Sequence, residues 1–232
     1  MKTIGMIGGM SWESSVEYYR LINRGVRARL GGLHSAESLM YSVDFAEIEA
    51  LQNAGDWAAA ADRMIDAARR LQAGGADFLV ICTNTMHKLA DAVEAAVTIP
   101  LLHIADATGA RVQAAGISRV GLLATRFTME ESFYSGRLRD RFGLDVRVPD
   151  AADRAVVHDV IYSELCAGIV NERSRARYRE IGRNLIEQGA QGLILGCTEI
   201  GLLVDQSHFE VPVFDTTRIH AEAAVEAALT PG

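Results

Sequence analysis

The sequence is poor in aromatic residues and short of basic ones. Aromatic residues make up 6% of the 232 residues, and 23 lysines and arginines face 30 aspartates and glutamates, which gives a formal net charge of −7. Basic stripes with interleaved aromatics, which are typical of nucleic-acid-binding surfaces, do not occur, so we expect no nucleic-acid partner. The apolar residues are mainly Ala, Leu, Val and Ile, which suit helices packed on a buried parallel sheet.

Several other features are also missing. No apolar run is long enough to span a bilayer, and the N-terminus lacks the apolar core of a signal peptide, so we expect a cytoplasmic protein without a membrane partner. The cysteines, Cys82, Cys166 and Cys197, are odd in number and are predicted to be free thiols. Metal-ligand spacings such as CxxC or HxxxH are absent, and no lysine stands in a recognisable pyridoxal-phosphate context, so neither metal nor cofactor is expected.

Apolar runs alternate with helical periodicity along the whole chain, which predicts parallel sheets with right-handed crossovers and an α/β fold. The expected strands cover residues 2–7, 39–43, 77–82 and 99–102, and then 119–124, 144–148, 192–196 and 211–214. The expected helices cover about 12–30, 57–73, 85–96, a segment from 104, 129–142, 152–166, 171–188 and 216–228.

An internal repeat runs through this pattern. Residues 75–85 (GADFLVICTNT) match residues 189–199 (GAQGLILGCTE), residues 99–103 match 211–215, and residues 4–7 match 120–123. Coincidence between generic βα units is the alternative explanation. The repeat predicts two pseudosymmetric lobes, residues 1–103 with 215–232 and residues 104–214, each a parallel sheet flanked by helices. The active site is then expected in the cleft between the lobes, with Thr83 and Cys197 on opposite walls.

Cys197 is the first candidate catalytic residue. It ends a buried strand and precedes Thr198, the expected start of a helix, whose positive end should lower the thiol pKa toward thiolate. A thiolate can accept a proton from carbon, and a thiol can return one. The alternative is a buried, inert cysteine. Thr83 is the second candidate, although a hydroxyl is far less acidic than a thiol; alternatively it only caps the following helix.

Other candidates lie near these strand ends. Backbone amides at helix starts and in the turns after the first strand of each lobe can cradle a carboxylate. His87 follows Thr83 by one helical turn and is expected to support it as a proton partner, unless it is a surface histidine. Trp12 is a weaker candidate. The predicted substrate-binding residues are Met10, Gln52, Asn84, Thr85, Thr125, Thr128, Thr198 and Glu199.

Four of these segments together carry a family resemblance. Residues 7–11 (IGGMS), 83–87 (TNTMH), 196–199 (GCTE) and 214–216 (FDT) resemble, in this order, the aspartate/glutamate racemase family. The resemblance implies two pseudosymmetric α/β lobes, no cofactor, a homodimer, and a two-base mechanism with paired cysteines at equivalent positions. It further implies that Cys197 handles the L-configured side of the substrate.

The sequence departs from the family pattern in two places. Thr83 stands where the N-terminal cysteine is usual, which implies unequal handling of the two enantiomers. The basic residues that hold the distal carboxylate in aspartate-specific members have no obvious counterpart near Ile48 or in residues 164–167, and Arg126 is only a guess for this role. The expected function is therefore cofactor-independent racemisation of amino acids, aspartate and glutamate or a broader range, between Cys197 and Thr83.

Two alternatives stay open. One is a superfamily decarboxylase or a cis–trans isomerase of small diacids that uses Cys197 alone. The other is a non-catalytic module that binds a small acid. The expected partner is in every case a small molecule, an amino acid or a dicarboxylate.

Overall fold

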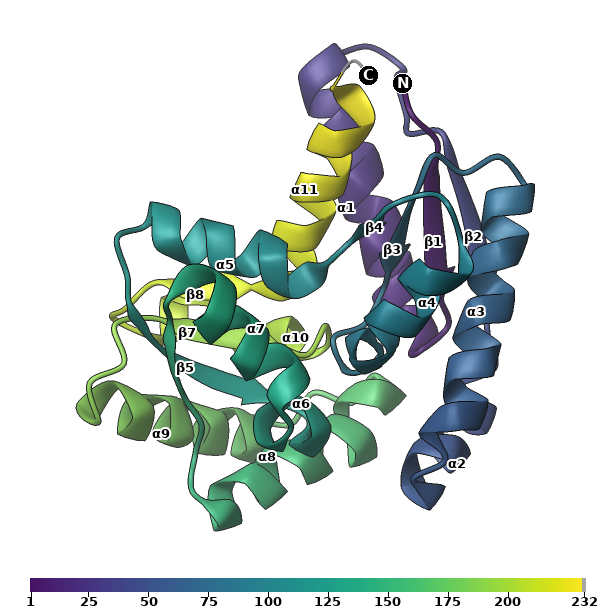
Figure 1. Ribbon diagram of the computed structural model, residues 1–232. Helices are drawn as coiled ribbons and strands as arrows, with labels where there is room; N and C mark the ends of the chain where they lie inside the picture. The colour runs from purple at the N-terminus through teal and green to yellow at the C-terminus, as the bar shows by residue number, and fades with distance from the viewer. Residues whose placement is uncertain (231–232) are drawn as a thin grey trace. The chain divides into compact units, whose positions relative to one another are not determined.

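The computed structural model describes residues 1–230, which fold as an α/β protein (Figure 1). Contacts divide the chain into two compact units, one formed by Met1–Ile104 with the segment from His220 onward, and the other by Ala105–Ile219. Each unit contains a four-stranded sheet, and all the strand pairings in both sheets are parallel. The α/β class, with parallel sheets flanked by helices, is confirmed.

The sheet of the first unit has the order β2-β1-β3-β4. Its strands are β1 (Ile4–Gly8), β2 (Ser38–Ser42), β3 (Phe78–Ile81) and β4 (Leu101–Leu102). Ile4 lies opposite both Ser38 and Phe78, so the three longer strands start in register. The chain moves to one side of β1 and then to the other, which makes the carboxyl ends of β1 and β3 a topological switch point.

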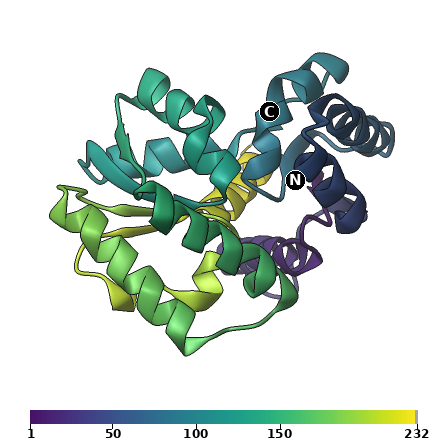
Figure 2. The ribbon, with the colours of Figure 1, turned by 90° about the horizontal axis from the view of Figure 1, so that it is seen from below.

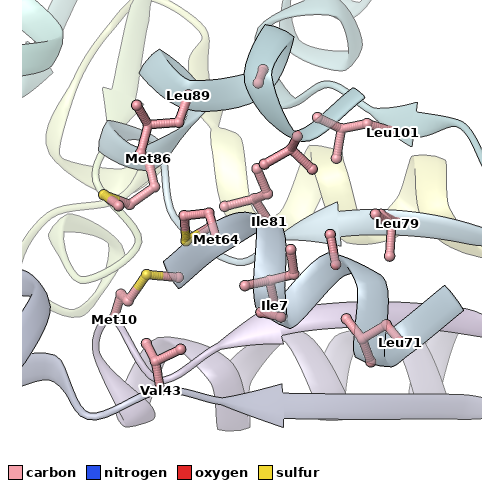
Figure 3. Close-up of a cluster of buried hydrophobic side chains, with 14 of the residues drawn as sticks. Ile7, Met10, Val43, Met64, Leu71, Leu79, Ile81, Met86, Leu89 and Leu101 are labelled. Atoms are coloured by element: carbon pink, nitrogen blue, oxygen red, sulfur yellow. The ribbon is translucent and has the colours of Figure 1, made fainter. Parts of the chain in front are cut away.

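Helices cover both faces of this sheet. On one face, α1 (Trp12–Leu30) and α11 (Thr216–Leu229) pack through a cluster that includes Ile22 and Val225. On the other face lie α2 (Phe45–Ala54), α3 (Trp57–Ala73), the 3-10 helix η1 (Thr85–Leu89) and α4 (Ala90–Ala96). Their apolar side chains surround Ile7 and Ile81, as Figure 3 shows. Burial of this apolar surface is the main stabilising contribution to the unit.

The sheet of the second unit repeats the pattern with the order β6-β5-β7-β8. Its strands are β5 (Arg119–Ala124), β6 (Asp145–Arg147), β7 (Leu193–Gly196) and β8 (Val213–Asp215). The helices are α5 (Ile104–Ala114), α6 (Arg126–Glu130), α7 (Ser132–Phe142), α8 (Ala151–Ser163), α9 (Glu172–Glu187) and α10 (Ile200–Leu203), with the 3-10 helices η2 (Leu165–Ala167) and η3 (Gln206–His208). Helices α8 and α9 run side by side (Figures 1 and 2), and the Tyr178 hydroxyl on α9 donates to the Val157 carbonyl on α8 over 2.7 Å.

The expected helices 12–30 and 57–73 are confirmed from end to end. Helix α2 was not expected, although Asp44 caps its start and Gly55 ends it with a left-handed conformation. The single helix expected over 129–142 is wrong, because Glu131 is extended and separates α6 from α7.

The expected lobe boundaries differ slightly from the observed ones. The second unit begins at Ala105 and ends at Ile219, whereas residues 104–214 were expected. The later end has a physical cause, because the Thr216 hydroxyl donates to the Leu195 carbonyl over 2.8 Å and Asp215 pairs with Leu195 in the sheet. These contacts hold the first turn of α11 on the second sheet.

Within residues 1–230, none of the helices combines the length and the apolar composition that crossing a bilayer requires.

Candidate active site

The repeat places Thr83 and Cys197 at equivalent points of the two sheets. Thr83 follows the end of β3, and Cys197 follows the end of β7, the strands that occupy the same place in the orders of the two sheets. Each lies at the switch point of its own sheet, where ligands bind in open parallel α/β folds. The sequence repeat is therefore confirmed as a repeat of topology.

Glycine and serine residues shape the turn after β1. Gly9 has φ +95°, and a Cβ atom there would lie 2.2 Å from the Val43 carbonyl oxygen, so only glycine fits. The Gly9 amide donates to the Ser15 hydroxyl over 2.8 Å, and the Ser14 hydroxyl donates to the Cys82 carbonyl over 2.8 Å. These buried serines, which the sequence reasoning missed, tie the end of β1 to the end of β3.

The segment after β3 exposes one side chain and buries its neighbours. Thr83 is partly exposed, whereas Cys82 points into the apolar cluster between the sheet and α1. Burial raises the pKa of the Cys82 thiol. Asn84 and Thr85 are buried at the start of η1. Strand alternation thus selects Thr83, and not Cys82, as the group that can meet a ligand.

His87 is buried and bonded to the main chain through both ring nitrogens. The Ile104 amide can only donate, so Nε2, at 3.2 Å, must accept. In the neutral ring the proton then lies on Nδ1, which donates to the Thr83 carbonyl over 2.8 Å. His87 supports the backbone of Thr83 rather than its hydroxyl, and the alternative of a surface histidine is wrong.

Two more histidines are buried beside His87. The ring centroid of His87 lies 4.6 Å from that of His103 and 5.7 Å from that of His220. His220 Nε2–H donates to the Leu102 carbonyl over 2.8 Å, so Nδ1 accepts a 2.8 Å hydrogen bond from the Tyr18 hydroxyl. Burial lowers the pKa of His220 to about 4, and this ring is neutral near pH 7.

Cys197 faces a carboxylate. Its thiol donates to Glu199 Oε2 over 3.0 Å, and the Thr198 hydroxyl donates to the same oxygen over 2.5 Å. Burial raises the pKa of Cys197 well above its ordinary value, and the negative charge of Glu199 raises it further. The expected lowering of this pKa is wrong, because α10 starts only at Ile200 and has four residues, too few for a strong dipole.

The phenol of Tyr178, on α9, is buried in the second unit. Burial raises its pKa, and negative charge on Cys197, Glu164 and Cys166 raises it too. Cys166 also contributes to the raised pKa of Cys197. Sequence reasoning missed Tyr178, because it stands in no motif and no periodicity separates it from core residues.

The remaining predicted substrate-binding residues lie either in the turn after β5 or among the buried side chains of the first unit. The Thr125 hydroxyl accepts from the Thr128 amide over 3.4 Å and caps α6 directly after β5, at the switch point. Met10 lies instead within the apolar cluster of Figure 3, so its side chain is part of the core. Gln52 is buried, with Nε2 3.1 Å from the Met86 sulfur.

Two weaker candidates from the sequence are Trp12 and Arg126. Trp12 is 65% exposed to solvent. The Arg126 guanidinium lies 5.5 Å from the centroid of the Phe127 ring, and its charge contributes to a lowered pKa of His158.

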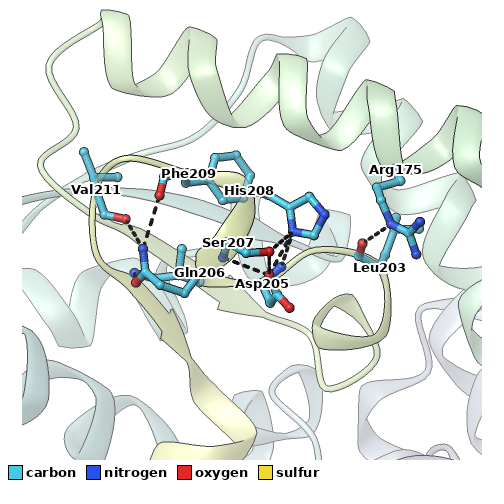
Figure 4. A network of polar contacts seen from close by, with 9 residues as sticks. Arg175, Leu203, Asp205, Gln206, Ser207, His208, Phe209 and Val211 are labelled. Carbon is cyan, nitrogen blue, oxygen red and sulfur yellow. Dashed lines mark hydrogen bonds and ion pairs between the residues drawn. The ribbon is translucent and has the colours of Figure 1, made fainter.

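The segment after α10 is held by its own polar network (Figure 4). Asp205 Oδ1 accepts from the amide and the hydroxyl of Ser207, and Gln206 Nε2 donates to the carbonyl of Val211 over 3.0 Å. The Arg175 guanidinium donates to the Leu203 carbonyl over 2.7 Å and joins this segment to α9. A cavity of about 730 Å³ lies beside the segment and β8. Cys197 is not among the residues that line this cavity.

A model of the Asp/Glu/Hydantoin racemase family matches residues 7–224 of the chain. A broad-specificity amino-acid racemase from Bacillus subtilis is 26% identical over 169 residues, which are 72% of this chain and 71% of that protein. A glutamate racemase from Pseudomonas paraeruginosa is 29% identical over 208 residues, 83% of this chain and 71% of that protein.

Solved structures share the fold along nearly the whole chain. A crystal structure described as a putative Asp/Glu racemase from Yersinia pestis is 56% identical, with a TM-score of 0.93, and covers 99% of this chain and 100% of its own. An aspartate racemase homologue from Pyrococcus horikoshii is 32% identical, with a TM-score of 0.86 and the same coverage. Arylmalonate decarboxylase, at 17% identity and a TM-score of 0.52, covers 99% of this chain and 94% of its own and shares the fold alone.

Proposed function

The chain belongs to the Asp/Glu/Hydantoin racemase family, and on that basis we propose that it interconverts the enantiomers of amino acids by moving the α-proton between Cys197 and Thr83 without a cofactor. Its named relatives are racemases, which are isomerases. The observation that carries the proposal is the equivalence of Thr83 and Cys197 at the switch points of two sheets with the same strand order. Racemisation needs one proton-transfer group for each face of the α-carbon.

In the proposed reaction, Cys197 acts on the L-enantiomer. The Cα–H bond breaks as an S–H bond forms, and the electron pair stays on the substrate as an enolate-like carbanion. The Thr83 hydroxyl delivers a proton to the opposite face and is reprotonated from water. The backbone amides near Asn84, Thr85 and Thr198 bind the α-carboxylate and stabilise the developing charge. The proposal requires both strand ends to act on one substrate molecule.

The protonation state of Cys197 in the free protein adds a step to the proposed reaction. Because its pKa is raised, the free protein holds a thiol. Before it can take the α-proton, the thiol must lose its own, and the Glu199 carboxylate at 3.0 Å is the group placed to receive it. The ammonium group of an incoming amino acid favours the thiolate, since a nearby positive charge lowers the pKa of an acid.

The test follows α-proton exchange in deuterated water by NMR, for both enantiomers of a panel of amino acids. Cys197→Ala should abolish exchange of the L-enantiomers, whereas Cys82→Ala, which removes a thiol from the apolar core, should retain it. Thr83→Val keeps the shape of the side chain and should allow deuterium exchange at the Cys197 face without inversion. Exchange that persists in Cys197→Ala contradicts the assignment of Cys197, and unimpaired inversion in Thr83→Val contradicts that of Thr83.

A second candidate function is favoured by the presence of a cysteine at only one of the two equivalent strand ends. A protein with Cys197 on one side and no matching thiol could decarboxylate or isomerise a small diacid by protonating one face only. Release of carbon dioxide from a malonate-type acid, without deuterium exchange into amino acids, supports this candidate. A small-acid binding module would instead show thermal stabilisation by the ligand and neither reaction.

The family assignment also leads us to expect a cytoplasmic homodimer. Light scattering coupled to size-exclusion chromatography tests the dimer directly, since the chain mass is 25.1 kDa.

A further inference from the structure

We infer that Thr216 is a positioning residue for Cys197, because its hydroxyl binds the end of β7 and so fixes where this strand places the Cys197 sulfur. The inference rests on the proposed racemase function and adds a residue to the same site. It follows from the hydrogen bonds that hold the main chain on either side of Cys197.

The main chain before Cys197 is held by both neighbouring strands. Leu123 and Asp215 lie opposite Leu195 in the sheet, and β8 ends at Asp215. The next hydrogen bond comes from a side chain, because the Thr216 hydroxyl donates to the Leu195 carbonyl over 2.8 Å. Thr216 is fully buried, so water is kept from this bond. Since Leu195 precedes Cys197 by two residues, the bond restrains the strand end that carries the thiol.

The main chain after Cys197 packs against the same residues of β8. The Ile200 amide donates to the Cys197 carbonyl over 3.2 Å and closes the turn that leads into α10. A Cβ atom at Gly201 would lie 3.3 Å from Asp215 Oδ2, so the start of α10 approaches the end of β8 closely. The end of β8 and the start of α11 therefore border the Cys197 segment on both sides.

The first unit has a hydrogen-bonded link at the equivalent place. The sequence repeat aligns Ile104 with Thr216, and each residue opens the helix that follows the last strand of its sheet. The Ile104 amide is joined to the Thr83 carbonyl through the ring of His87. In both units this position is thus bonded to the segment that carries a candidate proton-transfer residue, although the chemical groups differ.

This restraint matters for proton transfer from carbon. Reacting atoms must approach to about 3–3.5 Å in the correct orientation, and a misplacement of about 1 Å can cost ~100-fold in rate. Without the Thr216 hydroxyl, the buried Leu195 carbonyl loses a donor, and the strand end can shift toward another one. Loss of this hydroxyl should therefore lower kcat, while KM changes little, because the amides of Asn84 and Thr85 that are proposed to bind the carboxylate lie in the first unit.

The experiment compares Thr216→Val with Thr217→Val. The two threonines are neighbours in the first turn of α11 and are 0% and 1% exposed. Within the described residues the Thr217 hydroxyl has no hydrogen-bond partner, so Thr217→Val is a matched control that removes a buried hydroxyl without its bond. The readout is α-proton exchange in deuterated water, with the L-amino acid that exchanges fastest in the panel.

Thr216→Val should lower kcat by about tenfold or more and leave KM within about twofold. Thr216→Ser, which keeps the hydroxyl, should restore kcat, and Thr217→Val should leave it unchanged. Circular dichroism checks that each variant is folded. Thr216→Ala, which also lacks the hydroxyl, replaces Thr216→Val if the valine variant does not fold.

A second readout needs no substrate. Iodoacetamide alkylates the thiols, and mass spectrometry gives the rate for Cys197 relative to that for Cys82, which reports general loosening of the fold because it is buried in the apolar core. Thr216→Val should raise this ratio, since a strand end without its restraint exposes the Cys197 thiol more often. Thr217→Val should leave the ratio unchanged.

The outcomes separate this inference from the proposed function. Equal kcat values in Thr216→Val and Thr217→Val overturn the inference while racemisation stands. Failure of Thr216→Ser to restore kcat also overturns it, because the methyl group rather than the hydroxyl would then matter, and so does a rise in KM at unchanged kcat. If no amino acid exchanges its α-proton, the proposed function is overturned, and equal alkylation ratios in the two valine variants overturn this inference independently.

Discussion

The buried histidine His220 makes the stability of the first unit depend on pH. Its pKa is about 4 in the folded protein, and an unfolded histidine has a pKa near 6.5. Between these values the unfolded state binds more protons, so acid favours unfolding. The stability that the neutral ring provides is complete above pH 6.5 and is lost as the pH falls toward 4. At pH 5 the difference amounts to roughly 2 kcal/mol.

The perturbation that isolates this effect is His220→Gln. Glutamine does not titrate, and its amide N–H can donate to the Leu102 carbonyl as Nε2–H does. The variant should lose some stability at pH 7.5, but its free energy of unfolding should fall about 2 kcal/mol less than that of the unmodified protein between pH 7.5 and pH 5. His34→Gln, at an exposed position, should keep the original pH dependence.

The assay is urea unfolding followed by tryptophan fluorescence. Both tryptophans, Trp12 and Trp57, lie in the first unit, so their signal reports the unit that contains His220. Equal losses of stability in the unmodified protein and in His220→Gln between pH 7.5 and pH 5 would refute the reasoning. The neutral state of His220 would then contribute nothing to folding.

Three further predictions concern the strand ends. Gly9→Ala should lower the free energy of unfolding of the first unit in urea by at least ~2 kcal/mol, because the new Cβ atom meets the Val43 carbonyl. Gly55 also has a positive φ but lies in open space, so Gly55→Ala should cost only about 1 kcal/mol. Equal costs for the two variants would exclude the clash at Gly9. Glu199→Gln should lower the pKa of Cys197 and so speed alkylation of this thiol at pH 8, roughly tenfold for each unit that the pKa falls. Mass spectrometry of the peptide that contains Cys197 measures the rate. An unchanged rate would show that Glu199 does not raise this pKa. His87→Phe leaves two main-chain groups without their partner and should cost ~1–3 kcal/mol in urea, so that unchanged stability contradicts the bonding described for this ring.

The sequence by itself determined the fold class, the order of most helices and strands, and the internal repeat. Apolar runs of period two and helical runs of period 3.6 are local properties of the chain, and they predicted the α/β class and most elements. The repeat of residues 75–85 in residues 189–199 identified Thr83 and Cys197 as equivalent strand ends, which the sheet orders confirm. Helix α2 and the break at Glu131 were missed, because capping and local backbone geometry decide them rather than periodicity.

Only the tertiary structure decided the chemical state of the side chains at these strand ends. Burial raises the pKa of Cys197, and the negative charge of Glu199 raises it further. The bonding of His87 depends on the Ile104 amide, which follows it by seventeen residues. These pKa shifts and hydrogen bonds depend on distances between residues that are far apart in the sequence and on the exclusion of water. The local pattern of residues along a chain determines neither of these. The sequence could therefore identify the two candidate proton-transfer residues, but not the charge that surrounds them.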